Sequence, residues 1–224
     1  MGDDRHLWPR HRFASTAVII AVDGPAASGK GTIARALAAH FGLPHLDTGL
    51  LYRAVGLTVL RHGGDPADAI DALRASDFSD AIFDDPELRS EAAARAASVV
   101  SAHAQVRAAL LERQRAFSAQ PGGAVLDGRD IGTVIVPHAD AKLYVTAAPE
   151  VRAKRRHDEL VRAGVGATYD HVYADIISRD QRDSGRAFSP LLRASDADLL
   201  DTSDIAIPLA VCRAVALVEA RVTA

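Results

Sequence analysis

The 224-residue chain has no asparagine, one cysteine and three lysines, and aromatic residues make up only 5% of it. A single cysteine, Cys212, cannot form a disulfide within the chain, so we expect a reducing compartment, the cytoplasm. The 26 basic and 29 acidic residues nearly balance, which excludes the broad basic surface that drives nucleic-acid binding. Guanine-nucleotide switches commonly read their base with an Asn-Lys-x-Asp segment, and this chain cannot contain one.

The first 15 residues have no continuous apolar core, which is typical of neither a signal peptide nor a membrane anchor. We expect residues 1–15 to form a mobile N-terminal arm. We expect residues 16–224 to form a single domain, because this length suits one well-cored unit. The domain is expected to act as a monomer, with no membrane and no nucleic-acid polymer as partner.

Short apolar runs alternate with longer segments of helical period, which indicates an α/β fold with a largely parallel sheet. The predicted strands are residues 17–23, 45–47, 124–127, 141–146 and 198–201. The predicted helices are residues 30–41, 50–62, 149–163 and 209–222. Residues 63–122 contain no convincing strand, so we predict an insertion there, with one or two helices over residues 86–117.

Gly24, Gly29 and Lys30 have the spacing G-x-x-x-x-G-K, directly after a buried-looking strand and directly before a helix. A phosphate-binding loop, or P-loop, requires that context. Its backbone N–H groups converge on one anion, the helix directs its positive end at that anion, and the lysine reaches the β- and γ-phosphates of a nucleoside triphosphate. The predicted ATP-binding residues of the loop are Gly24, Pro25, Ala26, Ala27, Ser28, Gly29, Lys30, Gly31 and Thr32.

The residue after the lysine is Gly31, where the motif usually has serine or threonine. The hydroxyl that commonly touches Mg²⁺ is therefore displaced by one residue, to Thr32. Thr32 is the candidate metal ligand of this sequence, and the displacement puts direct contact with the metal in doubt.

The glycine-rich segment around Gly29 has two other interpretations. One is a tight strand-to-helix turn that binds nothing. The other is a nicotinamide-dependent oxidoreductase, because Gly29, Gly31 and Ala34 match the dinucleotide fingerprint G-x-G-x-x-A and Asp47 follows at about the right distance for a ribose hydroxyl. In that fold the first glycine closes the strand, whereas here the strand ends near Asp23 and Gly29 comes six residues later. The loop is too long for the fingerprint.

A P-loop leaves the fate of the γ-phosphate open, and a small-molecule kinase needs arginines at a second anion site that faces the first. An arginine on a helix surface is more often solvated than functional, so position decides. Four clusters follow predicted strands or lie in connecting helices: Thr48 and Arg53; Asp127, Arg129 and Asp130; Arg152, Arg155 and Arg156; and Arg179, Arg182, Asp183 and Arg186. The spacing i, i+3, i+4 of the third cluster is expected to aim its guanidiniums one way.

From residue 17 to the C-terminal helix the chain resembles the bacterial cytidylate kinases, a family of P-loop nucleoside monophosphate kinases. The motifs that carry the resemblance are DGPAASGKGT, LDTGLLYR, RAALLERQRAF, LDGRDIGTV, RDQRDSGRAFSPL and LLDTSD. It implies a three-layer P-loop NTPase fold with a central parallel sheet, a short helical monophosphate-binding insert at residues 63–122 and a small lid within about residues 149–186. Many members have a small antiparallel sheet in the insert, for which this segment has little room.

The resemblance implies transfer of the γ-phosphate of ATP to CMP or dCMP, with Mg²⁺ as cofactor. The alternative within the fold is another P-loop small-molecule kinase. By the same resemblance, the ATP-binding residues include Arg152 and Arg156 of the lid, and Arg155 belongs to the same lid helix. The implied catalytic residues are Lys30, Arg129 and Arg186.

The resemblance also implies the residues that bind the monophosphate. Its phosphate is expected to meet Thr48, Arg53 and Arg129. Cytosine is expected to be read by Ser98, Arg107 and Asp130, since a carboxylate and a guanidinium match the amine and the acceptors of its edge. The sugar is expected to be held by Arg179 and Asp183, with Arg186 bridging toward the phosphates.

Overall fold

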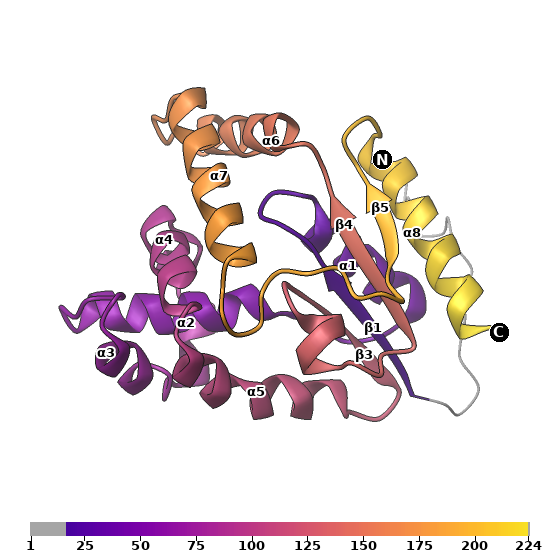
Figure 1. The fold of residues 1–224 in the computed structure, drawn as a ribbon, viewed down its shortest axis with the longest axis horizontal. Coiled ribbons are helices and arrows are strands. Elements are labelled where there is room, and N and C mark those ends of the chain that lie inside the picture. Colours follow the sequence, from indigo (N-terminus) through magenta and orange to yellow (C-terminus); the bar gives the residue numbers. More distant parts are fainter. Residues whose placement is uncertain (1–16, 224) are drawn as a thin grey trace, which may run out of the picture.

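Five parallel strands form the central sheet in the order β2-β3-β1-β4-β5 (Figure 1). They are β1 (Val18–Asp23), β2 (His45–Asp47), β3 (Gly123–Gly128), β4 (Ala141–Thr146) and β5 (Asp198–Asp201). The computed structural model describes residues 17–223, so the predicted arm of residues 1–15 lies outside the described residues. The predicted α/β fold is confirmed, and each predicted strand lies within one residue of an observed one.

Strand β1 lies in the middle of the sheet and is buried on both faces, which explains its continuous apolar run. On one face, Val18, Ile20 and Val22 pack with α1 (Lys30–Phe41) and α8 (Ile207–Val222). On the other face, Ala21 joins a cluster with the π-helical turn η3 (Ile131–Ile135) and with α5 (Ala104–Ser118). The sheet is therefore the middle of three layers.

Residues 63–122, which the structure describes throughout, contain helices and no strand. After α2 (Thr48–Arg61) come α3 (Ala69–Arg74), the 3₁₀ turns η1 (Asp80–Asp84) and η2 (Pro86–Arg89), α4 (Glu91–Val100) and α5. The prediction of one or two helices over residues 86–117 is confirmed. Helix α2 passes so close to α4 that a Cβ on Gly56 would lie 2.7 Å from the Cβ of Ala96. The insert is thus anchored to the helix that follows β2.

Helices α6 (Pro149–Arg162) and α7 (Tyr169–Ser184) pack on each other above the P-loop (Figure 1). Their shared cluster includes Leu160 and Ile176, and Ala26 and Ala27 of the loop pack against it. The sequence analysis predicted α6 but gave no range for α7, because α7 has few apolar positions that mark a buried face. Among residues 17–223, no helix is both long and apolar enough to cross a bilayer.

The chain leaves β1 for β2 on one side of it and later reaches β4 on the other side. The carboxyl end of β1 is therefore a switch point of the sheet, where open α/β sheets bind their ligands. The P-loop starts there, at Gly24. A Cβ on Gly24 would lie 2.0 Å from the carbonyl oxygen of Val145 in β4, so only glycine fits.

We predict that Gly24→Ala lowers the free energy of unfolding by more than about 3 kcal/mol, because the methyl group meets main-chain atoms that cannot move aside. Gly42→Ala is the matched control. Gly42 has φ 67° but no atom within 4 Å of its virtual Cβ, so only the left-handed conformation costs stability there, about 1 to 2 kcal/mol. Urea denaturation of both variants gives the comparison, and equal losses would contradict the prediction.

Candidate active site

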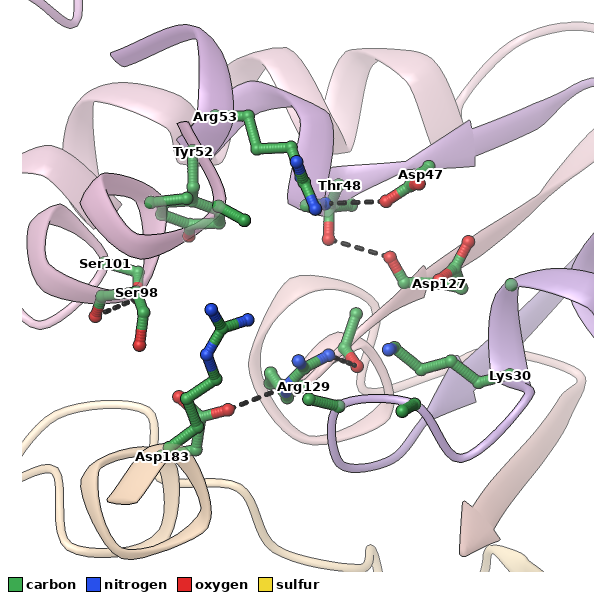
Figure 2. A pocket seen from close by; sticks show the side chains of 18 of the residues that line it. Lys30, Asp47, Thr48, Tyr52, Arg53, Ser98, Ser101, Asp127, Arg129 and Asp183 are labelled. Carbon is green, nitrogen blue, oxygen red and sulfur yellow. Dashed lines mark hydrogen bonds and ion pairs between the residues drawn. The ribbon is translucent and has the colours of Figure 1, made fainter. Parts of the chain in front are cut away.

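The P-loop leaves the N-terminus of α1 open to an anion. The N-cap residue Gly29 has no side chain to bond the first amides, and the first turn contains no acidic residue. Uncapped amides at a helix N-terminus, together with the helix dipole, make an anion-binding site. The side chain of Lys30 points from this turn into the pocket of Figure 2.

Two carboxylates stand opposite Lys30. Asp47 and Asp127 end the adjacent strands β2 and β3, where they are register partners. Burial raises the pKa of Asp47, and the neighbouring charge of Asp127 raises it further. Asp127 forms a 2.7 Å hydrogen bond with His45 Nε2, and its carbonyl oxygen accepts a 2.8 Å hydrogen bond from the Thr48 hydroxyl. The two carboxylates are therefore fixed side by side at the carboxyl edge of the sheet.

Guanidinium groups reach the same pocket from elements far apart in the sequence. The six arginines that line it are Arg53, Arg107, Arg129, Arg156, Arg179 and Arg186. Burial lowers the pKa of Arg53, and the charge of Arg156 adds to that effect. Within residues 17–223, five buried guanidinium nitrogens have no hydrogen-bond partner: Arg107 Nε, Arg179 Nε and Nη2, and Arg186 Nε and Nη1, although Arg179 Nε is ion-paired with Asp175. Buried donors without partners mark positions where a ligand would supply acceptors.

Asp183 holds two of these arginines together. Arg129 Nε donates to its Oδ2 at 2.8 Å, and Arg186 forms an ion pair with its other oxygen. Although burial would raise the pKa of Asp183, the charges of Arg129 and Arg186 overcome burial and lower it. Asp183 therefore stays ionised at neutral pH and holds both guanidiniums in the lining of the pocket, and Figure 2 shows its contact with Arg129.

Arg107 and Asp130 form a second buried pair. Arg107 Nη2 donates to Asp130 Oδ2 at 2.5 Å, and both side chains are less than a tenth exposed. The guanidinium carbon of Arg107 lies 5.3 Å from the ring centroid of Tyr52, which holds it from one face. The pair lines the part of the pocket between α5 and η3, away from the P-loop.

Most of the predicted site residues line this one pocket. Those that do are Ala26, Ala27, Lys30, Gly31, Thr48, Arg53, Ser98, Arg107, Arg129, Asp130, Arg156, Arg179, Asp183 and Arg186. Gly24, Pro25, Ser28 and Gly29 belong to the P-loop backbone without lining the pocket. Thr32, the candidate metal ligand, is exposed, and its hydroxyl accepts a weak 3.5 Å hydrogen bond from Arg35. The structure places that hydroxyl outside the pocket.

The expectation that Arg152, Arg155 and Arg156 point one way is wrong. Arg152 is buried and donates to both carboxylate oxygens of Asp180 and to the carbonyl of Ala26, so it ties α6 to α7 and to the P-loop. Arg155 donates to the carbonyl and hydroxyl of Thr202 after β5. Arg156 alone lines the pocket, paired with Glu91 of α4. Tertiary partners on three different elements decide where these side chains go.

Six polar residues that line the pocket were not predicted as binding residues: Asp47, Tyr52, Ser101, Asp127, Glu159 and Asp175. Asp47 was considered only as a ribose ligand, and Asp127 was placed in the cluster with Arg129 and Asp130 but was given no binding role. A signal was present, since each aspartate ends a predicted strand, and the carboxyl ends of parallel strands meet at one edge. Tyr52 and Ser101 carry no such signal, because their exposure to the pocket depends on how α2 and α4 pack.

Comparison with known proteins gives one consistent result. The family model described as "Cytidylate kinase" matches residues 20–220. A cytidylate kinase of Xanthobacter autotrophicus is 60% identical over 91% of this chain and 98% of its own length. One from Methylocella silvestris is 56% identical over 90% of this chain and 94% of its own length. A solved shikimate kinase of Bacteroides thetaiotaomicron, 12% identical with a TM-score of 0.50 over 93% of this chain and all of its own, shares the fold.

The pocket predicts a pH dependence for ATP binding. Burial lowers the pKa of Lys30 to about 8, and the positive charge of Arg129 adds to the effect. The ammonium is therefore present below about pH 8 and is lost as the pH rises through that value. We expect the Kd for ATP to be constant up to about pH 7 and to rise by up to about tenfold per pH unit above pH 8.

Calorimetric titration between pH 6.5 and 9.5 measures this Kd. Lys30→Arg is the control, because a guanidinium stays charged throughout the range and its Kd should not change with pH, whatever its absolute value. If the wild-type Kd changed with pH as little as that of Lys30→Arg, the loss of the Lys30 ammonium would not be what weakens ATP binding above pH 8.

Proposed function

The chain belongs to the cytidylate kinase family, and we propose that its pocket is the site where the γ-phosphate of ATP is transferred to CMP, giving ADP and CDP. One observation supports this above the rest: a single pocket contains the P-loop lysine, a second set of guanidiniums and the buried Arg107–Asp130 pair. These similarities do not favour an oxidoreductase or another small-molecule kinase. By extension we propose that dCMP is also an acceptor.

The triphosphate of ATP would lie over the P-loop. The uncapped amides at the start of α1 and the ammonium of Lys30 would bind its β- and γ-phosphates. Arg156, which projects from α6 toward the pocket, is placed to reach the γ-phosphate when the lid closes. The buried Arg152 would act indirectly, because its bond to the carbonyl of Ala26 fixes the loop.

The phosphate of CMP would lie between Arg53 and Arg129. Arg53 spends one nitrogen on the carbonyls of Leu88 and Ser90, which leaves its other donors for a ligand. Thr48 is also placed there, but its hydroxyl hydrogen must first leave the carbonyl of Asp127. A phosphate oxygen of CMP would attack the γ-phosphorus of ATP while the bond between that phosphorus and the β,γ-bridging oxygen breaks. The attacking oxygen of CMP is already largely ionised at neutral pH, because the second pKa of its phosphate group is about 6. No general base is therefore needed.

Cytosine would be read by the Arg107–Asp130 pair. Asp130 accepts a hydrogen bond from the exocyclic amine, and Arg107 donates to an acceptor of the same edge. Uracil has a carbonyl oxygen where cytosine has the amine, so it would face the carboxylate with an acceptor. The free donors of Arg179 and Arg186 suit the hydroxyls and the phosphate of the same nucleotide.

Asp47 and Asp127 fit a magnesium site shared with the phosphates of ATP. Mg²⁺ prefers oxygen ligands and keeps several waters, and it is commonly bound by one or two carboxylates together with substrate phosphates. No group of three or more metal-ligating side chains occurs within residues 17–223, so a site made by the protein alone is not present in that range. When bound, Mg²⁺ neutralises charge on the β- and γ-phosphate oxygens. We propose Asp47 and Asp127, rather than Thr32, as the residues that hold it.

We further propose that the enzyme acts as a monomer in the cytoplasm. One chain supplies every element of the pocket, from the P-loop to α7. The single cysteine suits a reducing compartment. Light scattering of the purified chain at assay concentration tests the monomer.

A coupled assay of ADP release tests the function, with ATP as donor and CMP, dCMP, UMP, AMP or shikimate as acceptor. We expect ADP release with CMP and dCMP and little with the other three. Lys30→Ala should lower kcat by about 100- to 1000-fold, because it removes a charge that faces the transferred group. Lys154→Ala is the control, since Lys154 is exposed and pairs only with Asp158 of its own helix. Release that needs no CMP, or equal loss in both variants, would overturn the proposal.

Asp130→Asn should reduce the preference for CMP over UMP. Its amide can donate to the uracil carbonyl and no longer carries the charge that favours the amine of cytosine. We expect the ratio of the kcat/KM value for CMP to that for UMP to fall roughly 5- to 150-fold, which corresponds to about 1 to 3 kcal/mol. Asp198→Asn, which breaks a carboxylate–arginine pair with Arg221 on the surface, is the control and should leave the ratio unchanged. An unchanged ratio in Asp130→Asn would contradict the base-reading role.

A further inference from the structure

The turn that follows Asp130 is capped by a residue from another strand. Asp130 is the N-cap of η3, yet its side chain makes no capping hydrogen bond. The first two amides of the turn, Ile131 N and Gly132 N, each donate at 2.8 Å to the carboxylate of Asp23. Asp23 is the last residue of β1, one position before the P-loop glycine Gly24.

Because Asp23 caps the turn, the carboxylate of Asp130 does not have to. An aspartate at an N-cap normally uses its carboxylate to accept from the second or third amide of its own turn. Here the second amide, Gly132 N, is already bonded to Asp23. The carboxylate of Asp130 is therefore available to pair with Arg107 at 2.5 Å, facing the pocket.

The surroundings of Asp23 indicate a role other than stabilising the fold. The side chain is buried, and burial raises its pKa to about 7. Within residues 17–223 it forms no ion pair, and the two amides that it caps do most to favour its charged form. The ammonium of Lys142 in the neighbouring strand β4 is bound elsewhere, to the carbonyl of Pro137 and to Asp196. A buried carboxylate without a partner cation costs stability. The two hydrogen bonds that Asp23 accepts from Ile131 N and Gly132 N are the interactions in the structure that offset this cost.

We propose that Asp23 is a positioning residue for the cytosine-reading pair: by capping η3 it holds Asp130 against Arg107 and so sets the selectivity for CMP. The inference rests on the proposed function of the same pocket. It assigns to Asp23, which directly precedes the P-loop, an effect on the recognition of CMP and not of ATP.

Asp23→Asn tests the proposal. A carboxamide has one acceptor oxygen, and its amine would face an amide N–H, so one of the two capping bonds is lost. We expect the KM for CMP to rise at least about tenfold and the CMP-over-UMP ratio of kcat/KM to fall by a similar factor. The Kd for ATP should stay within about twofold, which a general disturbance of the P-loop would not allow.

Asp140→Asn is the matched control. Asp140 is a carboxylate that also accepts a 2.8 Å hydrogen bond from a main-chain amide across the sheet, that of Ile19, but at the opposite end of β1. It should change neither the selectivity ratio nor the KM for CMP. Circular dichroism verifies that each variant is folded. Asp23→Glu, which keeps the charge but displaces the carboxylate by a methylene, is the second variant and should show the same loss of selectivity.

The double variant Asp23→Asn/Asp130→Asn separates an effect through Asp130 from an independent one. If Asp23 acts through Asp130, the double variant should have the CMP-over-UMP ratio of Asp130→Asn alone. An unchanged ratio in both Asp23 variants, equal losses for ATP and CMP, or effects that multiply in the double variant would each overturn the proposal. Wild-type enzyme without CMP-dependent ADP release would instead refute the proposed function.

Discussion

The pairing of charges inside one pocket is the constraint on which the rest of this structure depends. Six arginines and Lys30 face six carboxylates there, so the pocket as a whole is nearly neutral. Four of the acids are committed locally: Asp130 to Arg107, Asp175 to Arg179, Asp183 to Arg129 and Arg186, and Glu159 to Arg156. Lys30 and Arg53 have no ion pair among residues 17–223. They reach the same pocket from the P-loop and from α2, where we propose that the two phosphates meet for transfer (Figure 2).

Substrate binding has to compete with contacts that already cross the pocket. Ser98 of α4, which is expected to read cytosine, accepts a 2.9 Å hydrogen bond from Arg182 of α7. Ser101 accepts a 2.8 Å hydrogen bond from Arg186 in the same way. A nucleotide that reaches these serines replaces arginine donors that then become free for its phosphate and sugar. The insert and the end of α7 are therefore joined through side chains that we propose to bind substrate, which would suit a kinase that closes before transfer to exclude water.

Local patterns in the sequence sufficed for the parts of the fold and the site that local physics determines. The strands follow from apolar runs, and the P-loop follows from Gly24, Gly29 and Lys30 between a strand and a helix. Helix α7 was only partly predicted, because its buried face includes the charged Asp183 beside Val172 and Ile176. The partners of the arginines were not predictable, since Arg152 meets Asp180 only after two helices pack. The cap of η3 by Asp23, 108 residues away from Ile131, likewise exists only in the folded sheet.

The scarcity of lysine shows where a compact cation is needed. The chain uses 23 arginines and three lysines, so arginine is its default base. Lys154 is exposed, whereas Lys142 is buried and Lys30 lines the pocket. Lys142 is buried and reaches the carbonyl of Pro137 at 2.6 Å. Lys30 must fit among the loop amides beside Asp47 and Asp127. A point charge on a thin stem suits both places, whereas the wider fork of arginine suits the open side of the pocket, where phosphates are held from two directions.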